Sequence, residues 1–177
     1  MCPVGVIGEF FRAWRWGRLA VVIEQVDRDE ILPVRHAVLR PNLPIETAMY
    51  AEDAHPEVFH LAGRDDRGEV VASVTFFPDP LTIPTDGGGR APVAGGEPAW
   101  RFRGMATLPE HRNRGLGGEL LQAGVAEAAR RGARLIWCNG RSGAKAFYLR
   151  HSFTIRGEEF EIPPIGPHYV FVRLDLG

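Results

Sequence analysis

The chain has 177 residues, of which 21 are lysine or arginine and 22 are aspartate or glutamate, and 45% of the residues are hydrophobic. This length and composition predict one globular domain with a sizeable core and exclude a largely disordered or collagen-like chain. The formal charge of −1 gives no general attraction to nucleic acid or anionic membranes, and no apolar run approaches the ~20 residues that span a bilayer. We therefore expect neither nucleic acid nor membrane as a partner.

The two cysteines are placed in ways that argue against a disulfide framework. Cys2 is almost at the start of the chain, and Cys138 stands inside the apolar run 135–138. This usage favours a reducing compartment, and we expect the cytoplasm. Because no His–Asp pattern accompanies Cys138, it is expected to be a small buried residue rather than a nucleophile.

Residues 1–18 differ from the rest and are taken as an N-terminal extension of a domain at 19–177. Phenylalanine and tryptophan are interleaved there with arginine, and the arginines follow the first apolar residues instead of preceding them as in a secretory signal. The extension could be an amphipathic surface helix, a partner-binding arm or a poorly ordered tail.

The first half of the domain mixes strand and helix patterns. Asp27 and Glu30 have the spacing of a capping box, and the helix they begin must end near Arg40 because Pro41 follows. A short helix is predicted at 45–53. Apolar and β-branched runs bounded by polar turns predict strands at 19–26, 58–63 and 69–77.

Proline and glycine occupy eight of the fifteen positions in 84–98, which predicts a flexible surface loop. A phosphate loop at 87–90 is disfavoured, since it has no lysine and no helix pattern follows it. Beyond this loop, the patterns predict strands at 99–107, 134–139, 154–162 and 168–174, and helices at 118–131 and 142–151.

The segment 108–118 joins a predicted strand to a predicted helix and has the composition of an anion-binding turn. A helix N-terminus offers free N–H groups, and glycines let the backbone approach a phosphate closely. Arg112 and Arg114 can add charge-assisted hydrogen bonds. Neither a P-loop nor a G-x-G-x-x-G pattern is present, so a dinucleotide-binding fold is disfavoured. On spacing alone, a structural turn with two solvated arginines is an equally good interpretation.

Residues 112–117 read Arg-Asn-Arg-Gly-Leu-Gly and resemble the R/Q-x-x-G-x-G/A pattern of the GNAT superfamily of N-acetyltransferases. Residues 103–109 look like that family's fourth strand, and 137–139 followed by 146–148 and Phe153 resemble its second motif. The resemblance is firm over 99–153 and extends over 19–174. It implies an α/β domain with a mixed, largely antiparallel sheet of about seven strands and helices on both faces.

The resemblance also implies where acetyl-CoA would bind. The loop amides would hold its diphosphate, the backbone of the fourth strand would pair with its pantetheine arm, and the splaying of the fourth and fifth strands would admit it. The residues implied in cofactor binding are Met105, Ala106, Thr107, Arg112, Asn113, Arg114, Gly115, Leu116, Gly117 and Asn139. For Asn139, an ordinary turn asparagine is the alternative. No metal is implied.

Tyr148 matches the tyrosine that, in this family, protonates the departing thiolate, as a phenol with a pKa of ~10 can do. Its alternative role is a core aromatic beside Phe147 and Phe153. The family usually has Gly-Phe where this chain has Ser152-Phe153, so a positive φ there would strain the serine. The amide of Met105 or Ala106 is the implied oxyanion donor.

A general base is less visible, because the fourth strand has no carboxylate. Glu46, Asp53 and His60 are candidates, each more simply explained as a solvated or structural residue. Arg101 and Arg103 share one face of that strand, which suggests an acidic substrate group or, equally, two salt bridges. His111 could contact the 3′-phosphate of CoA or be a solvated loop residue.

The sequence therefore predicts an N-acetyltransferase that moves an acetyl group from acetyl-CoA directly to a primary amine of a small molecule or peptide. A non-catalytic CoA-binding module is the first alternative, and a nucleotide-binding enzyme using the same loop is the second. The acceptor, the acyl chain length and the oligomeric state stay open, with a homodimer as one option.

Overall fold

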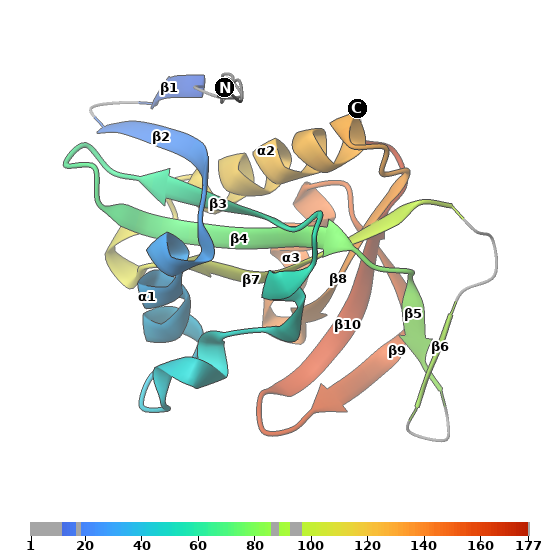
Figure 1. Cartoon of the computed structure of the whole chain (residues 1–177). Helices are drawn as coiled ribbons and strands as arrows, with labels where there is room; N and C mark the ends of the chain where they lie inside the picture. Colours follow the sequence, from blue (N-terminus) through green and yellow to red (C-terminus); the bar gives the residue numbers. More distant parts are fainter. Residues whose placement is uncertain (1–11, 17–18, 86–88, 93–96, 177) are drawn as a thin grey trace, which may run out of the picture.

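The computed structural model describes residues 12–16, 19–85, 89–92 and 97–176, and it is built around one large twisted sheet (Figure 1). The strand order is β1-β2-β3-β4-β7-β8-β10-β9, and every neighbouring pair is antiparallel except β7 and β8. The strands are β1 (Arg12–Trp16), β2 (Leu19–Val26), β3 (Phe59–Arg64), β4 (Val70–Pro78), β7 (Ala99–Thr107), β8 (Leu135–Arg141), β9 (Thr154–Ile162) and β10 (Gly166–Arg173). The expected mixed, largely antiparallel sheet is confirmed, with β1 as one strand beyond the seven.

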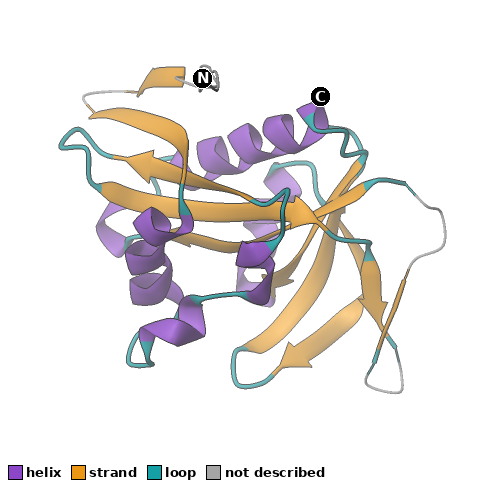
Figure 2. Ribbon diagram, in the orientation of Figure 1, coloured by secondary structure: helices purple, strands orange, loops and turns teal. Residues whose placement is uncertain are grey.

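Helices cover both faces of the sheet, as expected (Figure 2). The helices are α1 (Arg28–Leu39), α2 (Leu116–Arg130) and α3 (Lys145–Arg150). Neighbouring residues of β4 show the two-sided cover: Thr75 contacts Arg35 of α1, whereas Phe76 packs where Gly124 of α2 leaves room. Because side chains alternate along a strand, α1 and α2 lie on opposite faces. None of the helices formed by the described residues is long and apolar enough to cross a membrane.

The N-terminal segment forms a strand where it is described. Residues of β1 pair antiparallel with β2, from Arg12 opposite Ile23 to Trp16 opposite Leu19. The surface-helix alternative is therefore wrong for these five residues; tryptophan favours strands, and β2 offers them an open edge. Residues 1–11 and 17–18 lie outside the described part of the chain.

Two short predictions also need correction. The helix expected at 45–53 is a pair of 3-10 turns, η1 (Ile45–Ala48) and η2 (Ala51–Ala54), separated by extended backbone at Met49 and Tyr50. The loop expected at 84–98 contains half of a small second sheet, in which β5 (Thr82–Pro84) pairs with β6 (Arg90–Pro92). These three-residue strands were not predicted because the glycines and prolines around them are typical of loops.

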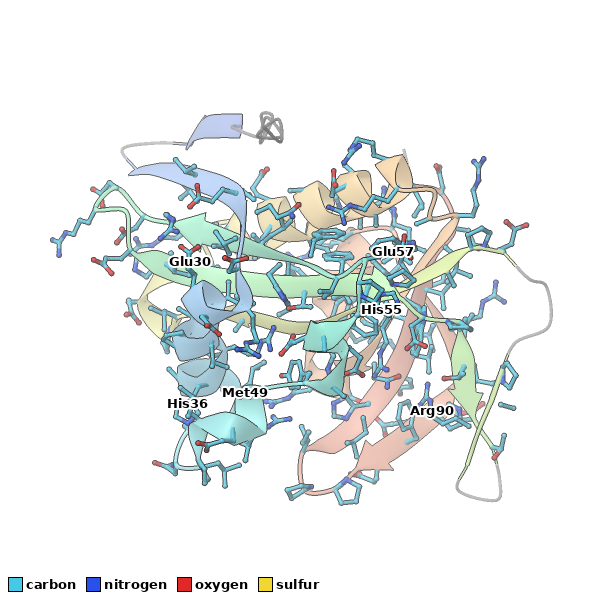
Figure 3. The ribbon with its side chains drawn as sticks, in the orientation of Figure 1. Glu30, His36, Met49, His55, Glu57 and Arg90 are labelled. Atoms are coloured by element: carbon cyan, nitrogen blue, oxygen red, sulfur yellow. The ribbon has the colours of Figure 1, made fainter. Side chains whose placement is uncertain are left out.

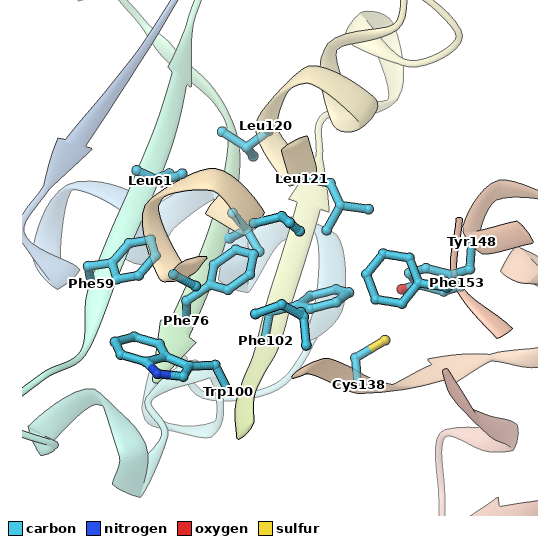
Figure 4. Close-up of a cluster of buried hydrophobic side chains, with 14 of the residues drawn as sticks. Phe59, Leu61, Phe76, Trp100, Phe102, Leu120, Leu121, Cys138, Tyr148 and Phe153 are labelled. Carbon is cyan, nitrogen blue, oxygen red and sulfur yellow. The ribbon is translucent and has the colours of Figure 1, made fainter. Parts of the chain in front are cut away.

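The main core lies between the sheet and α2 and runs from β3 to α3 (Figure 4). Phe59 stacks on Phe76 at 5.2 Å between ring centroids, and Phe76 packs on Phe102 at 5.3 Å. Phe102 in turn contacts Phe153 and Tyr148, at 5.7 and 6.1 Å. This chain of aromatic rings fixes α3, and with it Tyr148, against the centre of the sheet.

Candidate active site

The site begins where β7 and β8 separate. These parallel strands pair only at three positions, from Ala99 opposite Leu135 to Arg101 opposite Trp137. Beyond this point β7 continues to Thr107 and β8 to Arg141 without pairing to each other. The splayed strands that the family resemblance implied are thus present, and none of the strands formed by the described residues pairs with the β8-facing edge of β7 there.

A β-bulge in β7 lies at this open edge. The pairing of β4 with β7 shifts register between Ser73 opposite Ala106 and Thr75 opposite Arg103. The extra residue falls at Gly104, whose φ of +64° is in the left-handed region that favours glycine. A Cβ at Gly104 would stand only 3.0 Å from Arg35 Nε, so close packing also requires glycine. The bulge redirects the backbone of Met105 and Ala106 next to the gap.

The turn after β7 presents a run of free amides. A 3-10 turn, η3 (Pro109–His111), leads into it, and α2 begins at Leu116, two residues earlier than predicted. Asn113 and Gly115 have φ values of +59° and +82°, which bend the backbone into a concave turn. Within the described residues, no N–H group from 113 to 118 donates to a protein acceptor. Six consecutive donors at a helix N-terminus suit an anion such as a diphosphate.

Two arginine side chains flank this turn. Arg112 donates from Nε to the carbonyl of Thr107 at 3.0 Å, and Arg114 is exposed with its guanidinium in reach of solvent. Gly117 faces the open end of β7, where a Cβ would lie 3.4 Å from Met105 Cε and 3.8 Å from Thr107 Oγ1. The start of α2 therefore lies next to the open end of β7. His111 is partly exposed at its rim.

Tyr148 lies on α3, packs against Phe102 of β7 and is 8% exposed. Its ring packs 4.4 Å from that of Phe171, and Cys138 of β8 is a neighbour that affects its pKa. Burial raises the pKa of Tyr148 well above its ordinary value, and the neighbouring Cys138 adds to the rise. The phenol is therefore protonated at neutral pH and can donate a proton. Burial also raises the pKa of Cys138, which makes this thiol a poor nucleophile.

Two small residues near Tyr148 set its position. A Cβ on Gly140 would lie 2.4 Å from Tyr148 Cε2 and 2.7 Å from Phe171 Cδ2, so glycine makes room for both rings. Ser152, which follows α3, has a φ of +65°. This is the strained conformation expected if serine replaces the family's glycine.

Two of the three base candidates belong to a buried structural network. Asp53 accepts from Arg35 Nη1 at 2.7 Å, with side-chain exposures of 1% and 0%. His60 Nδ1 lies 2.9 Å from Thr75 Oγ1, and burial lowers its pKa. These groups anchor η2 to α1 and β4, and Asp53 has its charge already paired. Glu46 is exposed on η1, outside this network.

Arg101 and Arg103 extend from β7 on the α1 side, opposite the buried Trp100 and Phe102. Each has a carboxylate partner. Arg101 Nη1 lies 3.3 Å from Asp79, and Arg103 Nη1 lies 2.9 Å from both oxygens of Glu52. Of the two interpretations of this arginine pair, the structure supports salt bridges.

Sequence reasoning missed Arg90, which lies on the hairpin of β5 and β6 (Figure 3) and contacts Asn139 of β8. Its Nη2 donates to Asn139 Oδ1 at 3.3 Å, and its guanidinium lies over the rings of Trp137 and Phe160. The β-branched residues at 82–83 were the one local signal of a hairpin that could place this arginine. Within the described residues, no group of three or more His, Cys, Asp or Glu side chains is arranged to hold a metal.

Comparison with known proteins agrees with this geometry. Residues 24–153 match the Acetyltransferase (GNAT) family. The uncharacterized N-acetyltransferase YitI of Bacillus subtilis (strain 168) is 30% identical over 151 residues, which are 85% of this chain and 94% of YitI. Escherichia coli ElaA has a similar fold, with a TM-score of 0.65 at 15% identity over 86% of this chain and 99% of ElaA. E. coli YhbS, solved in complex with CoA, has a TM-score of 0.62 at 17% identity over 93% of this chain and 86% of YhbS.

The fold and the family match together define an acyltransferase that takes its acyl group from a CoA-type cosubstrate and passes it to an amine. The chain belongs to the GNAT acetyltransferase family and is an acetyl-CoA-dependent N-acetyltransferase.

Proposed function

We propose that the protein transfers the acetyl group directly from acetyl-CoA to a primary amine of a small molecule or peptide, without a covalent enzyme intermediate. The observation that carries this proposal is the run of free N–H groups at 113–118 beside the open end of β7, the strand whose Phe102 contacts Tyr148. A polyphosphate, an extended arm and a reacting thioester need these three features in this order.

Binding begins with the diphosphate on the amides of 113–118, and Arg112 and Arg114 add positive charge beside it. The pantetheine arm lies along β7 at Met105, Ala106 and Thr107, where it pairs with the backbone as a further strand would. This places the thioester in the gap between β7 and β8. Asn139, on β8, borders the gap from its other side.

The chemistry follows from the groups at the gap. The amine nitrogen attacks the thioester carbonyl carbon, and the amide of Met105 or Ala106 beside the bulge stabilises the oxyanion. The C–S bond then breaks, and the sulfur takes the electron pair together with a proton from the hydroxyl of Tyr148. The proton that the new amide nitrogen loses passes through water and restores the phenol. Asp53 and His60 take no part, because both are held in the buried network of Arg35.

CoA release from acetyl-CoA in the presence of a panel of primary amines tests this proposal. We expect turnover with at least one amine, and Tyr148→Phe should lower kcat about 100-fold or more while leaving the affinity for CoA unchanged. Tyr169→Phe is the matched control, since Tyr169 packs on Phe171 at 6.1 Å from the same face. Tight CoA binding with no turnover on any amine would instead identify a non-catalytic module, and preferential ATP binding a nucleotide enzyme.

The buried, unpaired thiol of Cys138 supports a reducing compartment for this reaction. We therefore propose that the enzyme acts in the cytoplasm.

A further inference from the structure

The sheet separates two sets of groups at the gap between β7 and β8. The free amides, α2 and Tyr148 lie on one face of the sheet, whereas Trp137 and Asn139 of β8 point to the other. The hairpin of β5 and β6 stands on this second face and brings Arg90 against both β8 residues. An acceptor that enters the gap from this face therefore passes Arg90.

The hairpin itself holds Arg90 in place. Arg90 Nε donates to Thr82 Oγ1 at 2.8 Å, and Nη2 donates to the carbonyl of Thr82 at 2.6 Å. With Nη2 also on Asn139, the third nitrogen, Nη1, donates to no acceptor in the described part of the chain. The guanidinium is thus fixed by one edge and has two N–H groups ready for an incoming acceptor.

The charge of Arg90 is also less balanced than those of its neighbours. Arg101 and Arg103 are paired with Asp79 and Glu52, whereas the described residues give Arg90 no carboxylate within salt-bridge distance. Burial lowers the pKa of Arg90, the charge of Arg101 lowers it further, and only Asp79 opposes them. An anion bound here would relieve the repulsion between the two arginines.

Two aromatic rings complete the surroundings. The guanidinium carbon of Arg90 lies 5.7 Å from the centroid of Trp137 and 5.5 Å from that of Phe160. Trp137 is itself fixed, because its indole N–H donates to the carbonyl of Asp79 at 2.9 Å. These rings orient the guanidinium plane and give the carbon skeleton of a ligand an apolar surface next to the cation.

We propose that the acceptor carries a carboxylate as well as its amine, and that Arg90 binds this carboxylate through Nη1 while the amine reaches the thioester. This inference rests on the proposed function and adds the substrate class to it. Arg90 is then a specificity-determining residue, since it distinguishes an anionic acceptor from a neutral amine of the same shape. A free amino acid and an acidic peptide both supply the required group.

Pairs of amines that differ only in carboxylate against carboxamide test the proposal. We choose 6-aminohexanoate with 6-aminohexanamide for the free amino acid, and glycylglutamate α-amide with glycylglutamine α-amide for the acidic peptide, so that the second member of each pair has no carboxylate. In at least one pair, kcat/KM for the acid should exceed that for the amide about tenfold or more. In Arg90→Met this ratio should fall to about one, because kcat/KM for the acid falls while kcat/KM for the amide stays the same. Arg67→Met, an exposed arginine in the turn between β3 and β4, should leave it unchanged.

The outcomes separate this inference from the proposed function. Equal rates for acids and amides, or an equal loss of both in Arg90→Met, would overturn the carboxylate proposal while the acetyltransferase activity stands. If none of these amines is acetylated, calorimetry of the CoA complex with the α-amides of N-acetylglycylglutamate and N-acetylglycylglutamine gives a second readout. Preferential binding of the acid that Arg90→Met abolishes supports the proposal, and absence of that preference contradicts it.

Discussion

The two faces of the sheet at the strand gap carry different kinds of chemical groups. On the face of α2 and α3, the site consists of main-chain amides, glycines and aromatic rings, with Tyr148 as its one buried titratable reacting group. On the face of α1, ion pairs dominate, including the fully buried pair of Arg35 and Asp53. A cosubstrate that never changes can be held by the backbone, whereas an acceptor is distinguished by side chains.

Removing Asp53 should have the largest effect on stability, because it leaves the charge of Arg35 buried and unpaired. We expect Asp53→Ala to lower the free energy of unfolding by about 3–5 kcal/mol. Urea denaturation measures this loss. Glu52→Ala is the control on the neighbouring, partly exposed pair with Arg103, and should cost about 1 kcal/mol or less. Equal losses in the two variants would show that burial does not distinguish these ion pairs.

On the face of α2 and α3, a substitution that crowds the ring of Tyr148 should act through side-chain packing alone. In Gly140→Ala, the new Cβ overlaps the rings of Tyr148 and Phe171, so we expect a loss of about 1–3 kcal/mol in stability and a lower kcat. The matched control is Gly143→Ala, where no atom lies within 4 Å of the added Cβ. Thermal unfolding and steady-state kinetics on both variants check this. Unchanged kcat in Gly140→Ala would mean that the position of the Tyr148 ring does not matter for turnover.

The shape of the amide turn depends on Gly115, whose φ is +82°. We expect Gly115→Ala to cost about 1–2 kcal/mol, and CoA affinity to fall up to about tenfold as the strained turn relaxes. Gly68→Ala has nearly the same φ, +80°, and equally open surroundings. It should lose similar stability but keep its CoA affinity. A loss of affinity in both variants, measured by calorimetry, would trace the effect to global destabilisation.

A smaller effect is expected from pH at the α1 face. Burial lowers the pKa of folded His60, the charge of Asp53 raises it and that of Arg35 lowers it again. The unfolded chain therefore binds a proton below about pH 6.5 that the folded chain resists, so stability falls as the pH falls. When the pH falls from 7 to 5.5, we expect the free energy of unfolding of His60→Gln to fall by about 1 kcal/mol less than that of the unsubstituted protein. His111→Gln should keep the full pH dependence of the unfolding free energy.

The contrast between the faces also explains what the sequence could predict. The amide turn and Tyr148 lie in short contiguous motifs, and the main strands and α2 follow from periodicity. The side-chain contacts on the α1 face join residues distant in sequence: 51 positions separate Arg103 from its ion-pair partner Glu52, and 49 separate Arg90 from its hydrogen-bond partner Asn139. Such pairs are set by strand order, which no local pattern encodes.

Local propensity also misled where tertiary contacts decide the structure. Arg12–Trp16 adopts strand geometry because β2 offers an edge, and η1 and η2 stay short because Tyr50 lies between two arginines. Arg35 and Arg103 approach the Tyr50 ring to 4.4 and 3.7 Å from its centroid. A continuous helix through this segment could not keep that contact.

Calorimetric titration of the purified protein with CoA, and separately with pantetheine, measures what the phosphate-bearing half of the cosubstrate contributes to recognition. Pantetheine has the same arm and thiol but no diphosphate, so we expect it to bind at least about 100-fold more weakly than CoA. Equal affinities for the two compounds would contradict the claim that the amides of 113–118 hold the cosubstrate.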